Sequence, residues 1–156
     1  MLNLNAVKKL LTKVSKENSL LGCIKYEKER LYFTNKYSLI VIYTKSDIEK
    51  PLLYNVFDGL FSVGNYYNVD GIVYTISQDR GDEIKEIKEV DNYYLINDVL
   101  FDKKLVDVTF KTINISFNKI NKDYLRVNTS KKVLTYNNES LILISILAQV
   151  GKRWTK

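Results

Sequence analysis

The first seventeen residues repeat apolar and charged positions with the period of an α-helix. The apolar positions form one stripe at helical spacing: Val7, Leu10, Leu11 and Val14. Lysines gather opposite that stripe or on its flank: Lys8, Lys9, Lys13 and Lys16. Asn3 or Asn5 is suited to cap the start. This pattern predicts a helix with one face for packing and one strongly cationic face.

The next pattern, over residues 20–45, is that of short strands. The segments LLGCIKYE, RLYFT and SLIVIYTK predict three strands, with EKE and NKY as the turns between them. The middle of the chain is mixed. IVYTISQ at 72–78 predicts a strand, and DRGDEIKEIKEVDN at 79–92 fits a loop, an exposed edge strand or a short helix. YYLINDVL at 93–100 is compatible with more than one state.

The opening pattern then returns. FDKKLVDVTF at 101–110 predicts a helix capped by Asp102, with Lys103 and Lys104 in its first turns. TINISFN, DYLRVNT and KKVLTYN predict three strands, and ESLILISILAQV follows them. Helices and strands grouped in this way predict an α+β fold of two helices on antiparallel sheets, with an internal duplication at a spacing of about 100 residues. We expect one domain over 1–150 and a basic tail over 151–156.

The charge balance narrows the class of partner. The net charge is +6 and the pI about 9.2, which favours a polyanion, although a simple solubility charge explains it too. The absence of histidine removes the commonest general base and zinc ligand, so catalysis would have to use carboxylates, lysines and a metal. We expect a non-catalytic protein with no metal and no cofactor. Cys23 lies in an apolar run and reads as a buried thiol. No apolar run is long enough to span a bilayer, so we expect a cytoplasmic protein without a membrane partner.

Two blocks of the chain resemble a domain of the bacterial sliding clamp, the β subunit of DNA polymerase III. LNAVKKLLTKVSKENSLLGCIKYEKERLYFTNKYSLIVI follows the layout of a helix ending in Val-Ser, a strand and a hairpin. FDKKLVDVTF resembles the second clamp helix, and TINISFN and YLRVNTSKKVLTYNNESLILISILAQV the closing strands. Asn35 and Ser38 depart from the clamp pattern, as does the end LAQVGKR. The resemblance implies a processivity-clamp-like domain.

This resemblance implies a non-catalytic DNA replication accessory protein that touches the DNA backbone without reading bases. The implied phosphate contacts are Lys8, Lys9, Lys13, Lys16, Lys103 and Lys104. A closed ring of six such domains would need six copies of the chain, that is, a homo-oligomer. A monomer would instead be an accessory that binds DNA, a polymerase or a host clamp.

Other functions compete with this one. The chain fits a protein-binding module, an inhibitor or adaptor of a replication or defence protein, with Arg153 and Trp154 as partner-binding residues. A metal-dependent nuclease would use carboxylates and lysines of the charged segment: Asp70, Asp82, Glu83, Lys85, Glu86 and Lys88. The tyrosine pairs in NYYN and DNYYL would suit stacking on unpaired bases, or sheet positions.

Overall fold

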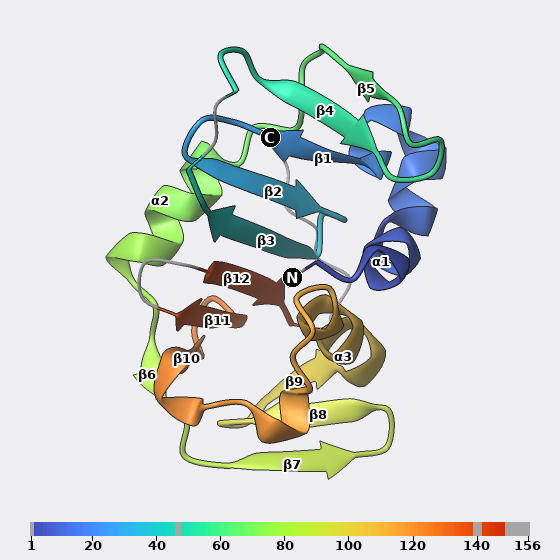
Figure 1. Cartoon of the computed structure of the whole chain (residues 1–156). Helices are drawn as coiled ribbons and strands as arrows, with labels where there is room; N and C mark the ends of the chain where they lie inside the picture. Colours follow the sequence, from blue (N-terminus) through green and yellow to red (C-terminus); the bar gives the residue numbers. More distant parts are fainter. Residues whose placement is uncertain (1, 46–47, 139–141, 149–156) are drawn as a thin grey trace.

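The computed structural model describes residues 2–45, 48–138 and 142–148. Its main feature is a nine-stranded antiparallel sheet, in the order β5-β4-β1-β2-β3-β12-β11-β10-β6 (Figure 1). A smaller antiparallel sheet has the order β7-β8-β9. The strands of the first half are β1 (Cys23–Tyr26), β2 (Arg30–Thr34), β3 (Ser38–Tyr43), β4 (Leu52–Asn55) and β5 (Phe61–Ser62). Those of the second half are β6 (Asp82–Glu83), β7 (Ile87–Val90), β8 (Tyr93–Ile96), β9 (Val99–Asp102), β10 (Leu125–Asn128), β11 (Val133–Asn138) and β12 (Ile142–Leu147).

The two halves of the main sheet repeat the same order of elements. Helix α1 (Leu4–Glu17) precedes β1, β2 and β3, and helix α3 (Lys103–Lys111) precedes β10, β11 and β12. The halves meet where β3 pairs with β12, with Ile40 opposite Ile144. Outward from this junction the order is β2, β1, β4 on one side and β11, β10, β6 on the other. The predicted α+β class and internal duplication are confirmed.

Both faces of the central strands are buried, because α1 and α3 cover one face and the segment that runs from Tyr66 through α2 covers the other. On one face Tyr136 of β11 meets Phe110 of α3, with ring centroids 5.4 Å apart. On the other face Tyr32 of β2 meets Tyr66, with centroids 5.6 Å apart. Figure 1 shows α1 and α3 together on one side of the molecule and α2 (Asp70–Gln78) on the other. Among the described residues no helix is long and apolar enough to cross a membrane.

The strand predicted for IVYTISQ is wrong, because these residues form most of α2. Their β-branched side chains favour a strand locally, but the helix is anchored at both ends across the sheet. At its start, Asp70 accepts a hydrogen bond from Arg30 of β2 at 2.6 Å. After its end, Asp79 accepts one from Asn128 of β10 at 3.0 Å. Tertiary contacts therefore override the local preference.

The strand predicted for TINISFN is wrong as well. The segment begins after the last residue of α3, Lys111, and comprises a turn and the start of a short 3₁₀ helix at Phe117–Lys119. Asn114 has φ +60°, in the left-handed region that asparagine tolerates, and this ends the helix. Both segments whose pattern fits more than one state form strands: residues 79–92 contain β6 and β7, and residues 93–100 contain β8 and the start of β9.

Candidate nucleic-acid interface

Helix α1 has the two faces that its sequence pattern predicts. The Asn3 side chain caps the helix, accepting a hydrogen bond from the Ala6 amide at 3.1 Å. Five apolar side chains of the helix are buried: Ala6, Val7, Leu10, Leu11 and Val14. The four predicted lysines are all exposed: Lys8, Lys9, Lys13 and Lys16. The sequence therefore places these four ammonium groups in water, available to an anion.

Helix α3 begins at a side-chain cap and packs on the main sheet through aromatic ring contacts. The Asp102 carboxylate accepts a hydrogen bond from the Leu105 amide at 3.0 Å, as predicted from the sequence. Phe110 is fully buried and its ring contacts Phe117 and Tyr136, at centroid distances of 5.2 and 5.4 Å. These ring contacts of Phe110 determine which side of α3 faces solvent.

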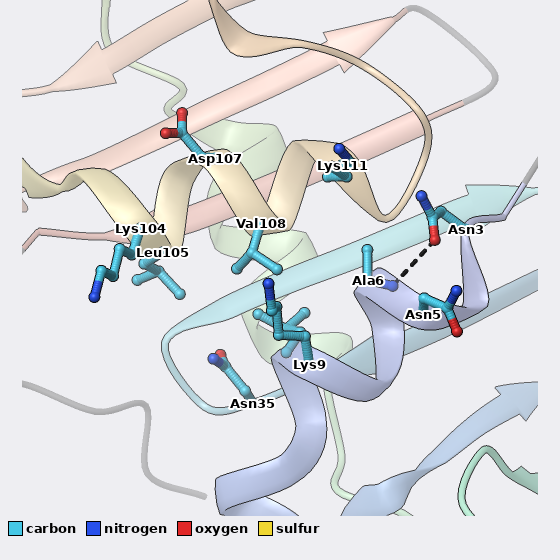
Figure 2. Close-up of a pocket in the computed structure, with 11 residues that line it drawn as sticks. Asn3, Asn5, Ala6, Lys9, Asn35, Lys104, Leu105, Asp107, Val108 and Lys111 are labelled. Atoms are coloured by element: carbon cyan, nitrogen blue, oxygen red, sulfur yellow. Dashed lines mark hydrogen bonds between the residues drawn. The ribbon is translucent and has the colours of Figure 1, made fainter.

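The two helices lie side by side, and the start of α1 is tied to the end of α3. The Asn3 amide donates to the Thr112 carbonyl at 2.8 Å, and its side chain donates to the Asn114 side chain at 3.4 Å. Between the helices runs a groove of about 840 Å³ (Figure 2). Its apolar lining comes from Ala6, Leu10, Leu105 and Val108, and its polar lining from Asn3, Asn5, Asn35, Lys9, Lys104, Asp107 and Lys111.

Three lysines therefore line one groove, from two helices that are distant in sequence. Lys9 comes from α1, and Lys104 and Lys111 come from α3; all three are exposed. Lys104 and Lys111 are seven residues apart, so they lie about 10 Å apart along α3, the length of about three nucleotide steps in one DNA strand. We name the set Lys9, Lys104 and Lys111 the lysine groove. Its ammonium groups donate hydrogen bonds and have no acceptor capacity, which suits phosphate oxygens.

Sequence reasoning did not find Lys111, although it carried a usable signal. The interval of seven residues from Lys104 is two helical turns, which places both side chains on one face of α3. Conversely, Lys8, Lys13 and Lys16 are exposed on α1 but do not line the groove. Lys8 leaves the helix about 100° around its axis from Lys9.

Lys103 has a different environment from the other predicted lysines. Its ammonium group lies 2.8 Å from a carboxylate oxygen of Glu89 on β7 and 5.8 Å from the ring centre of Tyr94 on β8. The hydrogen bond to Glu89 raises the pKa of Lys103. The structure thus places this cation at the small sheet, outside the groove.

Asp107 is the one carboxylate among the side chains that line the groove. It lies on α3 between Lys104 and Lys111 and accepts a hydrogen bond from the Tyr94 hydroxyl at 2.5 Å. Burial is the main cause that raises the pKa of Tyr94, and its hydrogen bond to Asp107 raises the pKa further. Tyr94 thereby holds a negative charge in place within a cationic groove.

Charge is divided unevenly along the chain. Residues 46–100 carry eleven acidic and four basic side chains, whereas the other 101 residues carry seven acidic and twenty basic ones. The acidic segment includes α2, on the sheet face opposite α1 and α3, with Asp70 and Asp79 at its two ends. The same segment also includes β7 of the small sheet, where Glu89 pairs with Lys103 of α3.

The carboxylates of the nuclease alternative are not brought together. Asp70 pairs with Arg30 at the start of α2, while Asp82 and Glu83 lie beyond its other end, on β6. The nine residues of α2 span about 13 Å. Lys88 pairs with Glu86 at 3.5 Å, and Lys85 is exposed nearby. Within the described ranges no three His, Cys, Asp or Glu residues are placed to hold a metal ion.

The tyrosine pairs are mainly packing residues. Tyr67 and Tyr94 are buried, and the Tyr66 hydroxyl accepts a hydrogen bond from the Thr34 amide at 3.1 Å. Burial raises the pKa of Tyr66. These rings are not displayed as a platform for unpaired bases.

Cys23 is buried, as expected. Arg153 and Trp154 lie outside the described residues.

Comparison of the chain with protein-family models, with curated proteins and with solved structures gave no match.

Proposed function

We propose that this protein is a non-catalytic accessory of DNA replication that contacts the phosphate backbone of duplex DNA through the lysine groove. The observation that carries the proposal is the placement of Lys9, Lys104 and Lys111 along one groove between α1 and α3. Further exposed lysines of α1 extend the cationic face beside it: Lys8, Lys13 and Lys16. The resemblance to a sliding-clamp domain supplies the replication role.

Physical considerations favour backbone contact over base reading. Lysine is a flexible point charge and does not present the planar fork with which arginine recognises guanine. The neutral polar side chains that line the groove are asparagines, which also bond phosphate oxygens, and Asp107 is the one anion among the lining residues. Three lysine–phosphate contacts predict that log K falls against log salt concentration with a slope of about −3.

The test is the affinity for a fluorescent 20-base-pair duplex, measured by anisotropy between 50 and 200 mM salt. We expect the double variant Lys104→Glu, Lys111→Glu to bind at least about tenfold more weakly and with a flatter salt dependence. The matched control is Lys85→Glu, Lys88→Glu, which changes the net charge equally from the acidic segment. Equal losses in both variants, or no loss in the groove variant, would reject the groove as the DNA site.

The ring version of this proposal needs self-association and is tested separately. Light scattering after size exclusion gives the solution mass over a wide concentration range. A closed assembly that supplies six clamp-like domains would support a ring, and loading on circular DNA would be measured next. A stable monomer would remove the ring and leave an accessory that contacts DNA from one side, with a polymerase or a host clamp as its protein partner.

A further inference from the structure

Residues 57–63 form an apolar surface at one end of the main sheet. Of the eight large apolar side chains that are exposed in the described residues, four lie in this stretch of seven. Their exposed fractions are 44% for Phe57, 65% for Leu60, 61% for Phe61 and 78% for Val63. We name these four side chains the edge patch. None of them lines the groove between α1 and α3.

Hydrogen bonds hold the edge patch in its exposed position. The Asn55 side chain accepts bonds from the amides of Phe57 and Asp58, at 2.8 and 3.2 Å. The Asp58 side chain accepts a bond from the Leu60 amide at 2.8 Å, and Gly59 adopts φ +73°, which glycine allows without strain. A turn with this many local bonds is preorganised, so a ligand would pay little entropy to order it.

The same segment contains an open strand edge. β5 pairs with β4 on one side and ends the order of the nine-stranded sheet. Figure 1 shows it at the upper end of the molecule. The Phe61 ring lies 4.9 Å from that of Tyr54 on β4 and 6.5 Å from that of Tyr26 on β1. Val63 is the first residue after β5, and its side chain is the most exposed of the four.

The chemistry of the chain itself argues against a second copy as the occupant. The edge patch exposes on the order of 400 Å² of apolar surface, so a symmetric dimer through it buries about 800 Å², below the roughly 1,200 Å² of stable interfaces. At the opposite end of the sheet, β6 has only two residues, Asp82 and Glu83, and both are exposed acidic residues. Placing them against Phe61 and Val63 would desolvate charges without a partner.

We propose that the edge patch binds an extended apolar peptide segment of another protein, which adds a strand to β5. Backbone groups of the segment would pair with the free edge of β5, and large apolar side chains at alternate positions would cover Phe61 and Val63. An area of a few hundred square ångströms suits two such side chains. The site is independent of the lysine groove, so it stands whether or not the groove binds DNA.

The experiment titrates the full chain with a fluorescein-labelled synthetic peptide, Lys-Thr-Leu-Thr-Phe-Thr-Leu-Lys, and follows anisotropy and backbone amide shifts. We expect saturable binding with shifts centred on residues 60–63. Phe61→Ser with Val63→Ser should weaken it at least about tenfold. The control Tyr74→Ser removes a side chain that is 67% exposed on α2 and should leave binding unchanged.

A second peptide separates strand addition from general hydrophobic adhesion. N-methylation at alternate residues removes backbone donors but keeps every side chain, and it should abolish binding if the peptide pairs with β5. Equal binding of the methylated peptide, equal loss in the Tyr74→Ser variant, or no saturable binding would overturn the proposal. A dimer in solution that disappears in the Phe61→Ser, Val63→Ser variant would also overturn it, in favour of a second copy.

Discussion

The two repeats of the main sheet share a fold but not a charge pattern. α1 has 14 residues and exposes four lysines, with Glu17 as its one acidic residue. α3 has nine residues, and two of its charged groups are engaged by the small sheet: Lys103 by Glu89, and Asp107 by Tyr94. The difference arises because the strands β7, β8 and β9 precede α3, whereas no described strand precedes α1.

This difference shows that two repeats can share the packing of their buried side chains while differing in the charged side chains that face solvent. Both helices bury an apolar stripe on the same face of the sheet, since Leu11 and Phe110 are each fully buried in one shared core. What surrounds the stripe differs between them. The second repeat contributes two of the three groove lysines, Lys104 and Lys111, together with the groove carboxylate Asp107, whereas α1 contributes Lys9.

The largest expected effect on stability comes from removing the buried Phe110 ring, which packs α3 on the main sheet. Phe110→Ala should lower the free energy of unfolding by about 3–5 kcal/mol, because the ring leaves a cavity beside Phe117 and Tyr136. Leu11→Ala should cost about 2–5 kcal/mol in the α1 repeat. Urea unfolding followed by circular dichroism measures both. Lys16→Ala serves as the surface control, within about 0.5 kcal/mol; a similarly small loss for Phe110→Ala would contradict the shared core.

High pH should destabilise the α3 side through Tyr94. Its folded pKa is raised above the usual value of 10.0 by burial and by Asp107, so the unfolded chain loses this proton first. The stabilisation is therefore complete below pH 10 and falls as pH rises above it, by up to about 1.4 kcal/mol per pH unit. Unfolding measured at pH 8, 10 and 11 should show a shallower decline for Tyr94→Phe than for the natural chain. Parallel declines would refute this assignment.

Lys9, which lines the groove, and Lys8, which does not, should contribute differently to the salt dependence of DNA binding. Lys9→Ala should reduce the salt slope for duplex DNA by about 0.9, because one phosphate contact is lost. Lys8→Ala removes the same charge from a neighbouring position that does not line the groove, and its slope should change less. Anisotropy titrations at four salt concentrations compare the two. Identical slopes would mean that the whole of α1 acts as a diffuse charge.

The smallest effect concerns the anion of the second repeat. Asp107→Asn should strengthen duplex binding about two- to fivefold, since it removes a surface carboxylate beside Lys104 and Lys111. Asp91→Asn, in the turn between β7 and β8, makes the same charge change away from the groove. The same anisotropy assay, at low salt, measures the difference. An equal gain in the control variant would show that net charge alone is responsible.

Predictions from the sequence succeeded where local rules were sufficient. The cap Asp102 and the apolar stripes of both helices follow from residues three or four apart, whereas the sequence leaves Asn3 and Asn5 as alternatives for the first cap and the structure shows Asn3. The strand predictions for 72–78 and 112–118 failed because β-branched residues suggested strands in both places. Of the three groove lysines, the sequence pattern singles out Lys9 and Lys104 and misses Lys111.

The sequence by itself determined the α+β class, the repeated order of helix and strands and the cationic face of α1, because each depends on short-range periodicity and charge. Only the tertiary structure decided that α2 is a helix, through contacts of Asp70 with Arg30, 40 residues away, and of Asp79 with Asn128, 49 residues away. It likewise decided which lysines share a groove and that Lys103 is paired with Glu89. Such pairings depend on chain segments that meet only when the sheet has formed, and no local pattern encodes them.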